Sequence, residues 1–359
     1  MPMKNLTLQK IKQMKTKLFY LIPIATLFAC NNTEEKTTPT PIEETKEVEA
    51  TLTPLQEQAA AMFGILPTNA ATEEYQLSDE KIALGKKLYF DNRLSKDNTI
   101  SCNSCHNLEN GTGVDNLPFS PGNDKGSFGG RNAPTTLNAA LHMAQFWDGR
   151  AIDVEEQAGG PILNPVEMAM PSKEAVIERL SKIEEYPELF STAFPNDDDA
   201  LSYRNIELAI GAFERTLITP SKFDDFVNGD ATALSEQEQK GLETFISTGC
   251  ISCHMGNTFG GQMYQKFGIY GKYWELTVSK KIDEGRFEVT QNEADKYFFK
   301  VPSLRNIEKT APYFHDGSVK ELDKAVTMMA LLQLNKTLTN EETANMVAFL
   351  KTLSGDVKY

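Results

Sequence analysis

One short motif that occurs twice constrains this chain more than any other feature. The pattern Cys-x-x-Cys-His stands at Cys102–His106 and again at Cys250–His254. In this pattern two thiols bond covalently to a porphyrin and the adjacent imidazole ligates its iron. A redox dithiol or a structural zinc site would not explain a histidine directly after both pairs, and zinc pairs usually lie about 15–20 residues apart. We therefore expect two covalent haem c groups. The expected haem-binding residues are Cys102, Cys105, His106, Cys250, Cys253 and His254.

Similar helical signals precede the two motifs. Ser78 can cap a helix that leads to the first motif, and Ser235 with Glu238 forms a capping box before the second. A helix that delivers the chain to the same motif twice indicates an internal repeat. The sequence thus predicts a mainly α protein with two cytochrome c-like haem domains, an N-terminal one at 56–226 and a C-terminal one at 227–359.

The remaining periodicity adds several helices and a few irregular stretches. Apolar residues recur at helical spacing in 136–146, 172–180 and 206–217. Thr339 and Glu342 predict a capping box for a closing helix. The other segments are expected to be a loop at 107–134, a boundary between the halves at 222–233, and a Gly- and aromatic-rich region at 255–300 in which 286–290 could be a strand.

The N-terminus reads as an export signal followed by a tether. Five lysines precede an apolar run of twelve residues, 18–29, that Cys30 follows, and twelve residues are too few to span a bilayer. We expect residues 1–29 to be a cleaved signal peptide, Cys30 to be lipidated, and the protein to be a membrane-anchored lipoprotein of the periplasm. Residues 30–55 are rich in Thr, Glu and Pro and are expected to form a flexible tether. Secretion without a lipid anchor is the alternative.

The net charge of the chain limits the classes of molecule that it could bind. The formal net charge is −14, and loss of the five leader lysines leaves the mature chain near −19. Nucleic acid is excluded as a partner on this ground, because its phosphates would be repelled. A basic or locally complementary electron carrier would be attracted instead.

Five further stretches carry a family resemblance. ISCNSCHN, RNAPT, AQFWDGR, QAGGPI followed by VEM, and TAPYFHDG resemble the bacterial di-haem cytochrome c peroxidases, in one order from Leu84 to Leu353. The resemblance implies an enzyme that reduces hydrogen peroxide to water with electrons from a small c-type cytochrome or cupredoxin. It also implies a homodimer.

The resemblance implies different roles for the two haems. The second haem would pass electrons and needs a sixth ligand; a thioether raises the iron potential and suits that role. Met329 matches the family's methionine at this position. Met328 and Met263 are competitors, and the plain alternative is that these methionines belong to a helix core.

The first haem would be the peroxide site. Cleavage of the O–O bond requires a group that takes a proton from one oxygen and returns it to the other, and a carboxylate can do this. The resemblance places Glu167 in this role and Gln157 beside it as an amide of the same pocket. A lone glutamate would more often be a solvated surface charge.

Other positions match the family between the two haems. Trp147 corresponds to a tryptophan that carries electrons from one porphyrin to the other, or is simply a buried core residue. His315 matches a histidine near the interface, where its role could be structural, and His142 has no assigned role. The expected ligands of one calcium ion are Asn132, Thr310 and Pro312, and oxygen ligands of this kind suit calcium.

One departure from the family pattern concerns the first haem. Many members hold a second histidine on that iron at rest, supplied by the loop after the first motif, and release it after reduction. No histidine occurs between His106 and His142 here. We therefore predict an open first haem that needs no reductive activation, with Met168 or Met170 as the alternative ligands.

Two other functions compete with the peroxidase. The chain could be a non-catalytic di-haem protein for electron transfer or peroxide sensing. It could also resemble the relatives that oxidise residues on a partner protein, although these carry a tyrosine at the position of Met329.

Overall fold

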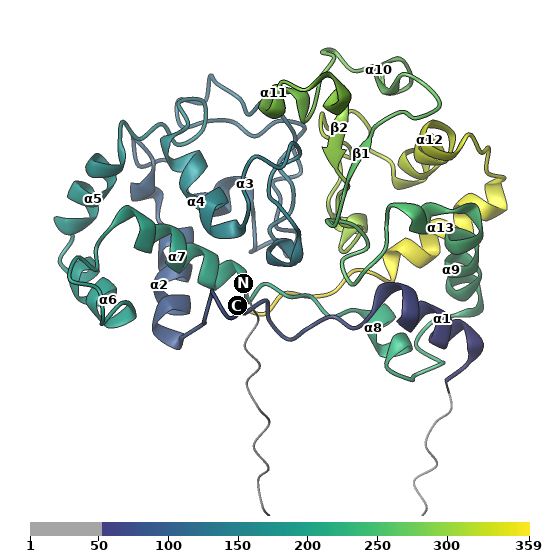
Figure 1. Ribbon diagram of the computed structural model, residues 1–359, viewed down its shortest axis with the longest axis horizontal. Coiled ribbons are helices and arrows are strands. Elements are labelled where there is room, and N and C mark those ends of the chain that lie inside the picture. Colours follow the sequence, from purple (N-terminus) through teal and green to yellow (C-terminus); the bar gives the residue numbers. More distant parts are fainter. Residues whose placement is uncertain (1–51) are drawn as a thin grey trace, which may run out of the picture. The chain divides into compact units, whose positions relative to one another are not determined.

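The computed structural model describes residues 52–359, in which α-helices predominate and two short strands pair (Figure 1). The predicted signal peptide, Cys30 and most of the tether lie outside the described residues. The expectation of a mainly α protein is confirmed. The helices are α1 (Pro54–Phe63), α2 (Asp79–Tyr89), α3 (Cys102–Cys105), α4 (Val154–Leu163), α5 (Lys173–Ser181), α6 (Glu185–Ala193), α7 (Tyr203–Glu214), α8 (Lys222–Val227), α9 (Glu236–Thr248), α10 (Tyr273–Leu276), α11 (Phe287–Thr290), α12 (Leu322–Leu334) and α13 (Asn340–Lys351).

The strands β1 (Tyr264–Lys266) and β2 (Phe298–Lys300) pair antiparallel. They lie within the Gly- and aromatic-rich stretch, where the sequence predicts a few short strands, such as one at 286–290. That segment contains the four-residue helix α11, so the strand prediction there is wrong. The two strands are far apart in the chain, and a local pattern cannot show such a pairing.

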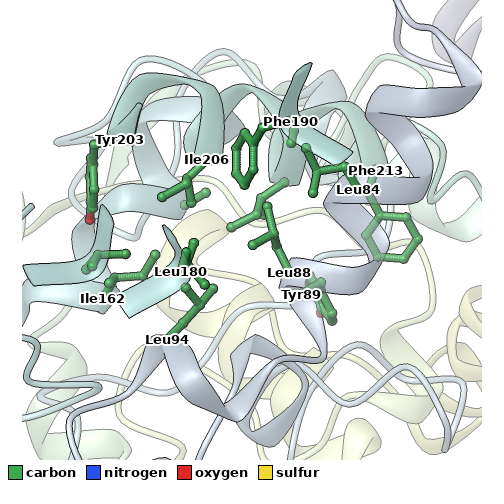
Figure 2. Packing of buried hydrophobic residues seen from close by; sticks show 14 of the residues in the cluster. Leu84, Leu88, Tyr89, Leu94, Ile162, Leu180, Phe190, Tyr203, Ile206 and Phe213 are labelled. Atoms are coloured by element: carbon green, nitrogen blue, oxygen red, sulfur yellow. The ribbon is translucent and has the colours of Figure 1, made fainter. Parts of the chain in front are cut away.

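Two apolar cores organise the helices. The first core joins α2 and α7 with α4, α5 and α6, and Figure 2 shows its tightly packed centre around Leu88, Phe190 and Ile206. The second core joins α9 and α13 with α1, α8 and α12. In it Phe63 of α1 stacks on Phe259 with ring centroids 4.1 Å apart. Each core therefore surrounds a pair of long crossing helices, one of which leads to a Cys-x-x-Cys-His motif.

Glycines allow the paired helices to cross closely. A Cβ atom on Gly85 of α2 would lie 1.8 Å from the carbonyl oxygen of Ala209 in α7. A Cβ atom on Gly241 of α9 would lie 1.9 Å from the carbonyl oxygen of Asn345 in α13. Both crossings thus require a glycine at the same relative place, since any side chain would collide with backbone.

A second repeat becomes visible once the backbone is known. Residues 133–150 and 301–318 share Pro134/Pro302, Asn138/Asn306, Phe146/Phe314 and Asp148-Gly149/Asp316-Gly317 at a constant offset. The paired asparagines, phenylalanines and glycines all have positive φ angles, and matching bridges join Gln145 to Ala151 and Tyr313 to Val319. The two segments therefore fold alike, and Trp147 occupies the place in the first that His315 occupies in the second.

Both copies of this repeat form hydrogen bonds to Thr219. The Nδ2 atoms of Asn138 and Asn306 donate to the Thr219 hydroxyl at 2.7 and 2.9 Å. The Oδ1 atoms of the same asparagines accept from the backbone N–H groups of Thr219 and Gly355, both at 3.0 Å. Thr219, which follows α7, therefore lies where the two copies meet.

The predicted helix starts agree with the structure. Ser78 caps α2, Ser235 and Glu238 form the capping box of α9, and Thr339 and Glu342 form that of α13. The helices predicted at 172–180 and 206–217 appear as α5 and α7. The helix predicted at 136–146 is wrong: only a 3-10 turn at Ala139–Leu141 forms there, because Asn138 and Phe146 adopt left-handed backbone conformations.

The domain limits at 56–226 and 227–359 remain a prediction, because residues 52–359 form one unit. Segments of the first predicted domain also contribute to the second core: α1 and α8 pack there. Tyr359 in turn stacks on Phe90 of the first. Within the described residues, no helix combines the length and apolarity needed to cross a membrane.

Candidate functional site

The first Cys-x-x-Cys-His motif forms the short helix α3 and the residue after it. The Tyr89 hydroxyl at the end of α2 donates to the His106 carbonyl at 2.6 Å, and the Leu108 amide donates to Asn103 Oδ1 at 2.8 Å. Burial raises the pKa of both thiols, that of Cys105 to about 11. Burial also lowers the pKa of His106, so its imidazole is neutral, which is the form that binds a metal.

Glu167 lies near enough to this motif for its charge to act on Cys105. It occupies a turn after α4, and its negative charge contributes to the raised pKa of Cys105 after the larger effect of burial. Burial raises the pKa of Glu167 itself, while Arg150 and a hydrogen bond to Asn164 oppose the rise. A carboxyl group with a raised pKa beside a candidate metal centre is suited to proton transfer.

The loop after the first motif is tied to the Glu167 turn. The Asn123 amide donates to the Glu167 carbonyl at 2.9 Å, and the Ser127 hydroxyl lies 3.3 Å from the Val166 carbonyl. Asp124 accepts three hydrogen bonds from within the loop, from the amides of Gly126 and Ser127 and from the Ser127 hydroxyl. This segment is therefore hydrogen-bonded within itself and to the backbone of the Glu167 turn.

Gln157 lies half-buried on α4, the helix that leads into the Glu167 turn. Glu167 is partly buried, which favours a site role over the alternative of a fully solvated surface charge. The site role of either residue remains a prediction, because a shared pocket for the two is inferred only from their neighbourhood in the chain.

The second motif borders a cavity of about 220 Å³. Cys250, Cys253 and His254 line it, and Met329 of α12 lines it too. His254 Nδ1 lies 2.9 Å from the Phe259 carbonyl, which can only accept, so Nδ1 carries the proton and Nε2 keeps its lone pair. Thiols, a neutral imidazole and a thioether around one apolar cavity fit a c-type haem with His and Met axial ligands.

The cavity separates the candidate methionines. Met329 lines the cavity, whereas Met328 is not among the lining residues and packs against the apolar cluster of Tyr313, Val319 and Ala325. Met263 is not among the cavity-lining residues, and its carbonyl accepts from the Val301 amide. Of the three methionines, Met329 has the position expected of a ligand.

Trp147, His315 and the three predicted calcium ligands border the same cavity. Trp147 Nε1 donates to the Asn132 carbonyl at 2.8 Å, and the Asn132 amide donates to the His315 carbonyl at 2.7 Å. The rings of Trp147 and His315 meet edge to face, with centroids 6.3 Å apart. Both aromatic side chains are therefore held at the edge of the second site.

These site residues occur in a chain with many relatives. Residues 79–232 match the family described as di-haem cytochrome c peroxidase. Cytochrome c551 peroxidase of Pseudomonas aeruginosa is 46% identical over 84% of this chain and 86% of its own length. The protein of the same name from Nitrosomonas europaea is 47% identical over 83% and 86%. The chain belongs to the di-haem cytochrome c peroxidase family.

A solved structure agrees with this assignment. A MauG-like protein associated with microbial copper homeostasis superposes with a TM-score of 0.71 and 28% identity, covering 81% of this chain and 93% of its own. The predicted family and enzyme class are confirmed by these matches, and the family implies two haem c groups. The residues around both motifs fit such groups, as described above.

Sequence reasoning missed several residues of the two sites in this peroxidase family member. Arg150 lies within AQFWDGR, but only the fold shows that its charge acts on Glu167. Lys300 and His142 both line the cavity of the second motif and contact each other, although they are 158 positions apart in the chain. No local pattern signals a contact of that range, because it depends on how β2 is placed.

Proposed function

We propose that this protein reduces hydrogen peroxide to water at the first motif, with electrons that enter at the second from a small c-type cytochrome or a cupredoxin. The observation that carries the proposal is the partly buried Glu167 beside Cys105, with its pKa raised by burial. When bound, the two porphyrin irons supply the redox chemistry. The direct test is peroxide-dependent oxidation of a reduced cytochrome c or cupredoxin by the protein with both haems attached.

In this proposal different side chains transfer the proton, adjust the pKa of the carboxyl group and conduct the electrons. The Glu167 carboxylate accepts a proton from one peroxide oxygen and delivers it to the other, and Gln157 lines the same pocket. Arg150 opposes the rise in the pKa of Glu167 that burial causes, and so favours its carboxylate form. Trp147, fixed by its hydrogen bond to Asn132, lies on the electron route between the sites.

We also propose that a calcium ion binds at Asn132, Thr310 and Pro312. All three residues line one cavity. The carbonyls of Lys309 and Ala311 accept from Asn116 Nδ2 at 3.0 and 2.8 Å, whereas among the described residues the carbonyls of Thr310 and Pro312 accept no backbone or side-chain hydrogen bond. Two free carbonyls and an amide oxygen are suitable ligands for calcium.

We propose further that no side chain of this protein blocks the peroxide side of the first haem at rest. His142 and His315 line the cavity of the second motif, which supports a first haem without a second histidine ligand. Met168 and Met170 are each 3% exposed and pack in the first apolar core. The loop at 122–127 is held by its own hydrogen bonds.

An open first site has a spectroscopic consequence. We expect the fully ferric protein to show one high-spin and one low-spin haem, and to turn over without a lag when donor and peroxide are added together. Electron paramagnetic resonance and stopped-flow absorbance measure the two properties. Two low-spin six-coordinate haems, or activity that appears only after pre-reduction, would contradict the proposal.

The assignment of Met329 gives a second prediction. Met329→Leu should lower the midpoint potential of the second haem, because a thioether ligand raises the iron potential. Turnover with a protein donor should fall with it. Met328→Leu is the matched control, since Met328 packs in a separate cluster and should leave the potential unchanged. Spectroelectrochemical titration decides the matter, and a lowered potential in the Met328 variant alone would reject the assignment.

Among the alternatives, oxidation of residues on a partner protein is disfavoured here, because the position that carries a tyrosine in those relatives carries Met329 in this chain, and Met329 lines the cavity of the second motif. An electron-transfer or sensing protein without turnover would fail the peroxide assay. We also propose export to the periplasm, lipidation at Cys30 and a homodimer, all carried over from the sequence pattern and the resemblance.

A further inference from the structure

Three cationic side chains are buried among the described residues, and Lys300 differs from the other two. Arg305 is 1% exposed and pairs with Asp224, and Arg215 is 3% exposed and pairs with Glu155. Lys300 is 6% exposed, and no carboxylate of residues 52–359 lies within salt-bridge distance of it. A buried charge without a counter-charge is costly. The Lys300 ammonium group therefore requires an anion that residues 52–359 do not supply.

The surroundings of Lys300 show where that partner would be. Lys300 ends β2, and its backbone amide donates to the Trp147 carbonyl at 2.8 Å. Its side chain lines the cavity that Cys250, Cys253 and His254 also line. The lysine therefore faces the same space that the second porphyrin would fill.

His142 completes the arrangement. Lys300 Nζ lies 3.3 Å from His142 Nδ1, and among the described residues this is its one hydrogen bond. Burial and the charge of Lys300 lower the pKa of His142 well below its usual value, so the imidazole is neutral and accepts at Nδ1. His142 cannot neutralise the ammonium group, and an ammonium group has two further N–H donors.

We propose that Lys300 is a carboxylate-binding residue that holds a propionate of the second porphyrin, with His142 orienting the ammonium group through Nδ1. A porphyrin propionate is an anion that enters this cavity with the group itself and supplies the missing counter-charge. Burial lowers the pKa of Lys300 to about 8 when no anion is present. A paired propionate would raise it again, since an opposite charge favours the charged form. The proposal rests on the second motif carrying a haem.

The test compares four variants of the full chain with both haems attached. Lys300→Met removes the charge and the donors, Lys300→Gln removes only the charge, and Lys300→Arg keeps both. Lys336→Gln is the control: its ammonium group also lies near the second motif, where it donates to the Thr248 carbonyl at 2.8 Å and lowers the pKa of Cys250, but Lys336 is exposed.

The expected result is a lower midpoint potential of the second haem in both the Met and the Gln variants. Loss of a nearby cation disfavours the added electron. Lys300→Arg should stay at the wild-type value, and Lys336→Gln should change the potential much less than Lys300→Gln, because solvent screens the exposed Lys336 charge. The resonance Raman band of propionate bending should shift in the same two variants. If the Met variant fails to retain its haem, the Gln variant gives the same comparison.

An unchanged potential and an unchanged propionate band in the Gln variant would overturn the proposal, as would equal shifts in the Lys336 control. Neither readout requires peroxide. If the wild-type protein shows no peroxidase activity, the proposed function is rejected. The midpoint potentials of the variants would still decide the role of Lys300.

Discussion

Replacing Glu167 by Gln is expected to lower peroxide turnover by about 10²–10⁴-fold, the usual contribution of a positioned acid–base group. The amide has the same shape as the carboxyl group but cannot accept the peroxide proton. Both haem spectra should stay unchanged, because Glu167 is not an iron ligand in the proposed site. Steady-state oxidation of a reduced donor measures the effect.

The control for this change is Glu188→Gln, an exposed glutamate of α6, which should retain full activity. The pH profile adds a second criterion. Because burial raises the pKa of Glu167, its carboxylate is lost as pH falls through that raised value, so wild-type activity should decline on the acidic side above the ordinary glutamate range. Wild-type turnover in the Glu167→Gln variant, or an unaltered acidic decline in its residual activity, would show that another group moves the proton.

The second large effect is expected on stability. Arg305→Met should lower the free energy of unfolding by about 3–5 kcal/mol, because it leaves the buried Asp224 without its cation. Both guanidinium Nη atoms of Arg305 bind the Asp224 carboxylate at 2.7 Å, and Nε donates to the Asn257 carbonyl at 2.6 Å. The pair thus joins α8 to the chain just after the second motif. Urea unfolding followed by circular dichroism gives the change.

Lys309→Met supplies the comparison for the stability effect. Lys309 forms an ion pair of 3.2 Å with Asp356, whose side chain is 96% exposed, so its removal should cost no more than about 1 kcal/mol. A loss in the Arg305 variant as small as that of the Lys309 variant would mean that water reaches Asp224 in the folded protein.

The sequence was most informative where the chemistry is local. Caps such as Ser78 and Thr339 act within four residues, so the starts of α2 and α13 could be predicted from the residues alone. Adjacency within Cys-x-x-Cys-His likewise identified the haem motifs. The failed helix at 136–146 has the opposite cause: Asn138 takes a left-handed conformation while its side chain bonds Thr219, a residue 81 positions away.

The second site shows the same limit. Three methionines could not be separated from their spacing, but the cavity distinguishes Met329 from Met328 by its lining. Lys300 gave no signal at all, because a lysine in a strand is ordinarily exposed and its burial here follows from the pairing of β2 with β1. Long-range packing, and not local preference, determines these positions.

The single threonine hydroxyl shared by Asn138 and Asn306 couples the two copies of the repeat. Loss of this one hydroxyl would leave the Nδ2 groups of both buried asparagines without their acceptor, and an unpaired buried donor is costly. The conformations of both copies, and of the Trp147 and His315 positions within them, therefore depend on the same side chain.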